Sequence, residues 1–413
     1  MSVDTSAPPG PPSLAHPLSR SQLTWLQTEL RAWQAAGILD GDQAGRIAAR
    51  YRADHRNPLA RLLLTIGAVF VGVGVIWLVA ANLDSLTPTT RFVGIVLFWL
   101  GTLVGAEVLA GTGDSDRSSP LVGAVRLMSA VGFGGVVFQA AQSLQVPAYE
   151  PTLVGCWALG ALLHAYAVRA VLPLVVAILA GATWFGWAVL PESESGMTVV
   201  LCLVGIAVAG IALAAVHGRW APQLAGPWRE LGATFLLAGL FTAALPFVDG
   251  HDFRAATTLT VALLVAVVAS GAGVVASPGA RWEVLGALGA AVAAAGLVAW
   301  DTGADLGLDG GPVTGEDVLQ TAVSVVVYVV VAVGVAVVGA LRESWRLTAL
   351  ATVGLVAFTT FQSFAVFARI LEGAWLFVAL GLVFLGTGYL FDRARRRLVA
   401  AVIDDDATAE VSR

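Results

Sequence analysis

The sequence contains no lysine, only two cysteines and few charged residues of any kind. All 23 basic residues are arginine, and charged residues make up 12% of the 413 positions, about half the share in a soluble domain. Because acidic residues outnumber arginines, no cationic surface for nucleic acid is indicated. Cys156 and Cys202 lie inside apolar runs, where cysteine acts as a small hydrophobic residue. Neither a disulfide framework nor a metal site is predicted.

Recognised catalytic motifs are missing as well. We find no Walker loop, no glycine-rich dinucleotide turn, no zinc-protease helix and no nucleophile elbow. Nor does a pair of carboxylates lie near the centre of an apolar run, where coupled carriers often need one. The sequence therefore predicts no cofactor, and it gives no indication of an enzyme.

Long apolar runs dominate the sequence instead. Hydrophobic residues make up 57% of it, in blocks of about 20, the length of helix that crosses a bilayer. We predict an all-α polytopic transmembrane helical bundle of about 12 spans. The range is 10–12, because two pairs of runs nearly touch, near 168–173 and 367–372. The predicted spans are 60–81, 91–110, 124–143, 152–168, 171–190, 197–216, 230–248, 256–276, 282–300, 318–341, 346–367 and 372–391.

The arginines indicate how these spans are oriented. Inner loops of this assignment are rich in arginine, whereas outer loops are acidic, as at Glu192, Asp249 and Asp305. Positive-inside bias then places both termini in the cytoplasm. The exclusive use of arginine fits a GC-rich bacterium, so we expect a multi-pass protein of the bacterial plasma (inner) membrane. The inner-loop arginines are Arg117, Arg126, Arg169, Arg219, Arg229, Arg281, Arg342 and Arg346.

Four segments follow from this pattern. Residues 1–18 form a Pro-rich tail that we expect to be disordered. Residues 19–57 form a cytoplasmic helical hairpin, and residues 58–392 form the transmembrane bundle. Residues 393–413 are a tail that is first basic and then acidic.

The hairpin is the one candidate soluble unit. Leu26 and Leu30 belong to an apolar helix stripe, Gly37 follows that helix, and Asp40 with Gln43 makes a capping-box pair for a second helix. A unit of under about 40 residues folds poorly by itself. We therefore expect it to rest on a partner surface.

Intramembrane polar side chains are candidate functional sites, because placing them in lipid is costly. Glu107, near the inner end of span two, either snorkels to the interface or pairs with Arg126 of span three. His164, five residues before Arg169, is either a satisfied interfacial histidine or part of a proton relay.

Three glutamines complete the candidates. Gln139 and Gln142 are three residues apart, a spacing that places side chains on one helix face. They either bond across a helix interface or line a polar pocket. Gln362, beside Thr359, Thr360 and Ser363, forms a second polar cluster that is able to face the first.

Glycine is abundant, with 46 residues, mostly inside the predicted spans. Gly101 and Gly105 form a GxxxG pair, and Gly155 with Gly160 forms a looser one. Because small residues let helices approach closely, we expect these positions at helix contacts.

The segment Leu26–Tyr51, LQTELRAWQAAGILDGDQAGRIAARY, resembles the start of a bacterial predicted membrane protein family with an N-terminal domain of unknown function 2157. Residues 132–147 and 156–174 are similar to that family in looser form, as is the closing span with its arginines. Gln142-Ser143-Leu144 departs from the Gln-Ile-Tyr of many relatives. The resemblance implies a helical hairpin followed almost at once by the first span. It implies no activity and no catalytic residues.

Three functions are compatible with these features. The first is a non-enzymatic membrane module whose hairpin, residues 19–57, binds a protein partner or mediates self-association. The second is a transporter or flippase of an uncharged or amphiphilic substrate, motivated by the glutamine clusters. The third is an enzyme acting on lipid-linked substrates, with Glu107 and His164 near one interface. The sequence favours the first, with membrane lipids and no nucleic acid among its partners.

Overall fold

The computed structural model describes residues 16–18, 20–53, 58–81, 87–111, 119–145, 147, 149–193, 195–245, 248, 250–300 and 315–362, and single residues up to 393. The chain divides into two compact units, residues 1–66 and 67–413. Of the predicted tails, residues 1–15 and nearly all of 393–413 lie outside the described residues. So does most of the predicted twelfth span, 372–391.

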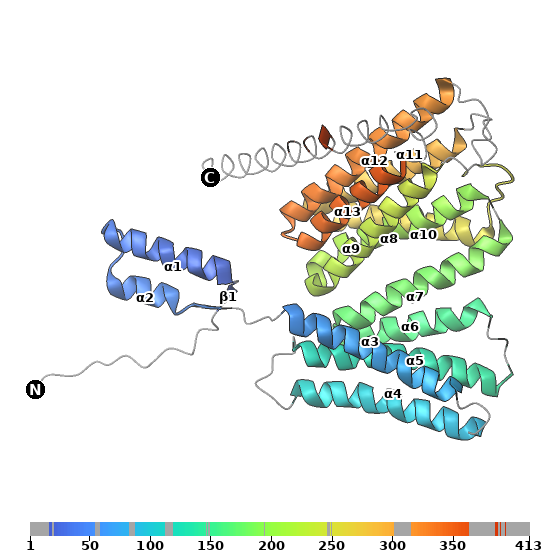
Figure 1. Ribbon diagram of the computed structural model, residues 1–413, viewed down its shortest axis with the longest axis horizontal. Helices are drawn as coiled ribbons and strands as arrows, with labels where there is room; N and C mark the ends of the chain where they lie inside the picture. Colours follow the sequence, from blue (N-terminus) through green and yellow to red (C-terminus); the bar gives the residue numbers. More distant parts are fainter. Residues whose placement is uncertain are drawn as a thin grey trace, which may run out of the picture. The chain divides into compact units, whose positions relative to one another are not determined.

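The first unit contains the predicted helical hairpin, made of α1 (Arg20–Ala35) and α2 (Gly41–Ala48) (Figure 1). Gly37 has φ +70°, a left-handed conformation in which glycine is unstrained. The capping box is confirmed. The Gln43 amide donates to the Asp40 carboxylate at 2.6 Å, and the Asp40 amide donates to Oε1 of Gln43 at 3.0 Å.

The hairpin also carries a small sheet that the sequence analysis did not predict. Strands β1 (His16–Leu18) and β2 (Tyr51–Ala53) pair in parallel, with His16 opposite Tyr51. The end of the predicted disordered tail is therefore a strand. Backbone pairing with the segment after α2 explains the difference, because such pairing depends little on side-chain pattern.

The second unit is a bundle of helices that alternate in direction (Figure 1). Helix α3 runs across the unit boundary, and α4–α13 follow it. The helices are α3 (Pro58–Ala81), α4 (Pro88–Gly111), α5 (Pro120–Ser143), α6 (Pro151–Val168), α7 (Val171–Val189), α8 (Gly196–Trp220), α9 (Pro222–Ala243), α10 (Thr257–Ala276), α11 (Arg281–Ala299), α12 (Gly315–Leu341) and α13 (Trp345–Gln362). Short 3-10 turns, η1 (Leu190–Glu192) and η2 (Pro278–Ala280), follow α7 and precede α11.

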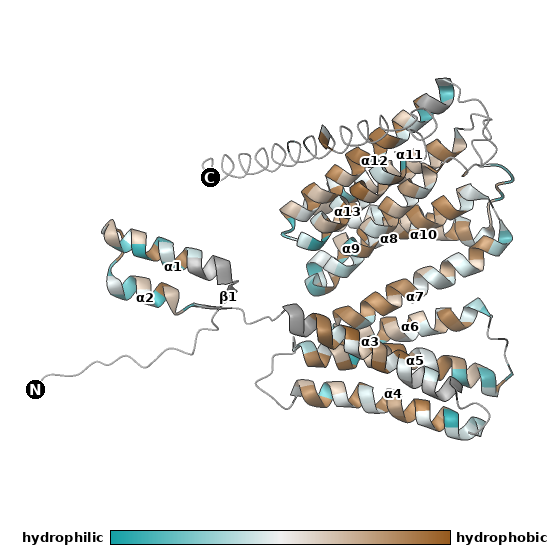
Figure 2. Ribbon diagram, viewed as in Figure 1, coloured by the Kyte–Doolittle hydropathy of each residue, from teal (hydrophilic) through white to brown (hydrophobic). Residues whose placement is uncertain are grey.

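Eight described helices are long and apolar enough to cross a membrane, which confirms the all-α polytopic bundle. Every predicted span from the first to the eleventh corresponds to one helix, α3 to α13. Helix α9 begins eight residues earlier than predicted, because its first turns are polar. The fourth and fifth spans are two separate helices, which the left-handed residue Arg169 (φ 51°) divides. Hydrophobic residues cover the helices, and hydrophilic ones gather near their ends (Figure 2).

Helix α8 is the centre of the larger core and packs against α9, α10 and α11. The backbones of α8 and α9 meet at Gly210 and Gly232, where an added Cβ on Gly210 would lie 3.2 Å from Cα of Gly232. Gly155 and Gly160 also lie at helix contacts, as expected. The GxxxG pair does not: Gly101 and Gly105 have open space around them in the described part of the chain.

Candidate functional site

Glu107 of α4 forms an ion pair with Arg126 of α5. Arg126 donates through Nε to Oε1 at 2.8 Å and through Nη2 to Oε2 at 2.9 Å, a bidentate arrangement. The Arg126 side chain is only 7% exposed, whereas that of Glu107 is 43% exposed. Of the two alternatives for Glu107, pairing is therefore the one present, and the carboxylate neutralises a buried guanidinium.

His164 of α6 lies near this pair. Glu107 and Arg126 are both near enough to act electrostatically on its ring. Its Nε2 is buried and makes no hydrogen bond to the described residues, and the same holds for Oγ of Ser129, three residues after Arg126 on α5. Glu107 and Arg126 are paired across α4 and α5, and α5 in turn packs on α6, the helix of His164.

The glutamines do not form one cluster. Gln139 is buried in α5, whereas Gln142, in the last turn of that helix, is exposed. Gln362 donates from Nε2 to the carbonyl of Ala244 at 2.9 Å, and so ties the end of α13 to the end of α9. Helix α5 packs mainly on α4, α6 and α7, and α13 on α9 and α12. The glutamine clusters that motivated a transporter therefore do not come together in the described residues.

A chain of hydrogen bonds that the sequence analysis missed joins α6, α8 and α9. Nδ1 of His217 lies 2.6 Å from the Leu213 carbonyl, which can only accept, so this nitrogen carries a proton. In the neutral ring, Nε2 then accepts from the Tyr166 hydroxyl at 2.7 Å. The Trp228 indole donates to the same hydroxyl at 3.3 Å. Every polar side-chain atom of these three residues has a partner.

An ionic cluster joins the starts of α9 and α11 to the end of α12. Glu283 of α11 accepts from Arg229 Nε at 2.7 Å through one oxygen. Through the other it accepts from Nε and Nη2 of Arg342, at 2.8 and 2.6 Å. The Glu283 side chain is 10% exposed and that of Arg229 is 13% exposed. One nearly buried carboxylate thus holds two guanidiniums.

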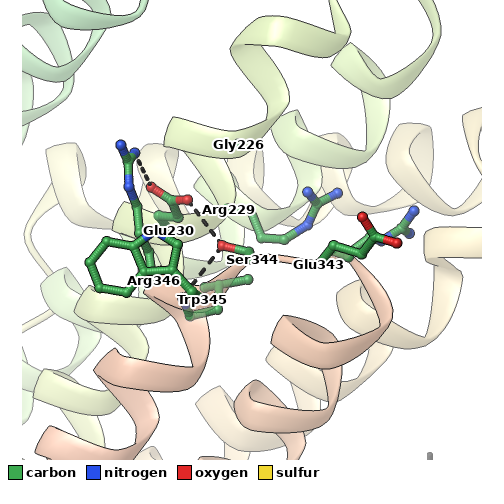
Figure 3. A pocket seen from close by; sticks show the side chains of 9 residues that line it. Gly226, Arg229, Glu230, Glu343, Ser344, Trp345 and Arg346 are labelled. Carbon is green, nitrogen blue, oxygen red and sulfur yellow. Dashed lines mark hydrogen bonds and ion pairs between the residues drawn. The ribbon is translucent and has the colours of Figure 1, made fainter. Parts of the chain in front are cut away.

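A second ion pair and a pocket lie beside this cluster (Figure 3). Glu230 of α9 accepts from Nη1 of Arg346 and from Oγ of Ser344, each at 3.2 Å. Ser344 immediately precedes α13 and also accepts from the Leu347 amide at 3.5 Å. The pocket has a volume of about 330 Å³, and its lining residues are Gly226, Arg229, Glu230, Arg342, Glu343, Ser344, Trp345, Arg346 and Leu347.

The sequence contained a partial signal for this site. Arg229, Arg342 and Arg346 were assigned to inner loops, and Glu230 and Glu283 are acidic exceptions beside them. The pairing joins residues 54 to 116 positions apart, which a single sequence does not specify. Among the described residues, no three His, Cys, Asp or Glu side chains are grouped to hold a metal ion.

Comparison with known proteins identifies the N-terminal part of the chain. Residues 31–174, from within α1 to the start of α7, match the model of the family described as Predicted membrane protein (DUF2157). This match agrees with the resemblance of the hairpin motif, and the matched segment contains Glu107, Arg126 and His164. Neither the curated proteins nor the solved structures include a significant match to the chain.

Proposed function

We propose that this multi-pass protein is a non-enzymatic membrane module whose hairpin mediates interaction or assembly. The observation that carries the proposal is the shape of the hairpin. Two amphipathic helices and a two-stranded sheet form a folded unit that precedes the first span in the sequence, with very little interior of its own.

The hairpin lacks enough interior to use its apolar side chains. Leu30 and Ala44 are buried, at 4% and 5% exposed, whereas Trp25 is 60% and Ile38 is 68% exposed. A unit this small gains little stability from its own core. Large aromatic and aliphatic residues left on a surface are typical anchors of protein interfaces. Burial of Trp25 and Ile38 against a protein partner, or a second copy of the chain, would supply the missing apolar contacts.

The proposed location is the bacterial plasma membrane, with both termini in the cytoplasm. The basis is the distribution of arginine, which favours the ends of α6, α8 and α12 and the starts of α5, α9 and α13. The hairpin precedes α3 and lies on the same side in this arrangement. Its partner would then be cytoplasmic or another copy in the same membrane.

Replacement of Trp25 and Ile38 by glutamate in the full-length protein tests the proposal. We expect the double variant to reach the membrane at the normal level. Its oligomer or co-purified partner, measured by crosslinking in membranes and by light scattering, should fall at least tenfold. Gln27→Glu is the matched control, because it also adds a negative charge at an exposed position of α1, the helix of Trp25. Unchanged assembly in the double variant would refute the proposal.

A further inference from the structure

The pocket before α13 has a lining that favours an anion. Arg229, Arg342 and Arg346 line it together, and they come from α9, the α12–α13 turn and α13. A guanidinium has five N–H donors. Within the described chain, Arg229 uses Nε alone and Arg346 uses Nη1 alone in hydrogen bonds. Donors on both side chains therefore remain for a ligand.

The charges around the pocket balance without a ligand, because three guanidiniums face three carboxylates. Glu283 and Glu230 together offset two of the three guanidiniums. Glu343 also lines the pocket, is exposed, and makes no ion pair with the described residues. It occupies the left-handed turn between α12 and α13, with φ 52°. Of the two lining carboxylates, Glu230 is paired with Arg346, so Glu343 is the one whose negative charge is not offset by an ion pair in the described chain.

The backbone adds to the attraction. Helix α13 begins at Trp345, so the positive end of its dipole lies at the pocket, although the Leu347 amide of its first turn already donates to Ser344. Trp345 itself is 76% exposed. Tryptophan rings at the ends of membrane helices sit at the level of the lipid headgroups. The pocket therefore combines guanidiniums, a helix start and an interfacial aromatic ring.

We propose that this pocket binds a phosphate group, carried by an anionic lipid of the adjacent leaflet or by a soluble phosphate. Guanidiniums match the geometry of phosphate oxygens and bind them in a bidentate manner. The volume of about 330 Å³ exceeds the needs of a phosphate and also admits part of a lipid headgroup. The site is independent of the hairpin, so it goes beyond the proposed function.

The test uses the full-length protein in lipid nanodiscs and in detergent. Phosphatidylglycerol is titrated against a phosphatidylcholine background, and bound lipid is counted by native mass spectrometry. In a second arm, inorganic phosphate is added to phosphatidylcholine nanodiscs, and the thermal midpoint is measured. Arg346→Gln should weaken binding about tenfold, because one charge-assisted contact is lost. Glu343→Gln should strengthen binding about threefold, because the opposing charge is removed.

Arg254→Gln is the matched control, since Arg254 is exposed and lies between α9 and α10, away from the pocket. Its binding should equal that of the unaltered protein. Phosphatidylglycerol binding with this variant pattern identifies a lipid as the ligand, and phosphate binding with the same pattern identifies a soluble ligand. The proposal would be overturned if Arg346→Gln and Arg254→Gln lost equal affinity for the ligand, or if Glu343→Gln gained none. A misfolded protein does not gain affinity, so Glu343→Gln keeps the test decisive.

Discussion

Glu283→Ala should destabilise the bundle more than loss of Glu230, the carboxylate of the neighbouring ion pair. The side chains of Glu283 and Arg229 are 10% and 13% exposed, so the variant leaves a nearly buried guanidinium without its partner. Loss of one member of a buried pair costs about 3–5 kcal/mol. Arg342, which also loses its partner, is 37% exposed and becomes hydrated, so its unpairing adds at most about 1 kcal/mol to the loss of stability. We expect a total near the lower end, about 3 kcal/mol.

The assay is reversible unfolding in mixed micelles, followed by tryptophan fluorescence. Glu230→Ala is the matched control, because its partner Arg346 is 53% exposed and the expected loss is about 1 kcal/mol. Replacement of Arg229 by Met together with Glu283 by Leu should recover most of the stability, since an apolar pair needs no desolvation of charge. Equal losses in Glu283→Ala and Glu230→Ala, or no recovery in the double variant, would refute the reasoning.

Five further substitutions give distinct results. Gly160→Ala should lower the free energy of unfolding by about 1–3 kcal/mol, because its methyl group meets a phenylalanine ring of α5. Gly101→Ala, in open space, should raise the free energy of unfolding by up to about 1 kcal/mol. Thermal melting of both variants measures the two changes. Tyr166→Phe should cost about 1–3 kcal/mol in the same assay, whereas Tyr149→Phe, at an exposed site, should change little. Asp40→Ala should remove about 1 kcal/mol of capping, seen as roughly fivefold faster amide exchange in the first turn of α2.

The helices could be predicted because their cause is local. An apolar run of about 20 residues favours a membrane helix regardless of its neighbours. The capping box at Asp40 was equally readable, since its two hydrogen bonds join residues three apart. The start of helix α9 could not be predicted from hydropathy. Arg229 and Glu230 lower the local hydropathy, so the predicted start at 230 missed two polar turns that begin at Pro222.

The candidate site was predictable only where it joins consecutive spans. Glu107 and Arg126 lie at the adjoining ends of α4 and α5, so their pairing followed from the span order. The Glu283 cluster joins α9, α11 and α12, whose packing depends on the whole fold. Gln139 and Gln142 do not share one environment, although they are three residues apart. Three steps of 100° leave their side chains 60° apart around the helix axis. At the end of α5, that angle separates a buried side chain from an exposed one.

The two ionic groups divide the chain in an unexpected way. The family segment, residues 31–174, contains the Glu107–Arg126 pair, and the later helices contain the Glu283 cluster. Arg126 and Arg229 are therefore each neutralised by a carboxylate from their own part of the chain. The hydrogen bonds of Tyr166 that join the two parts involve only neutral groups. A change of sequence in the later helices therefore leaves the buried Arg126 with its carboxylate, because Glu107 and Arg126 both lie in the family segment.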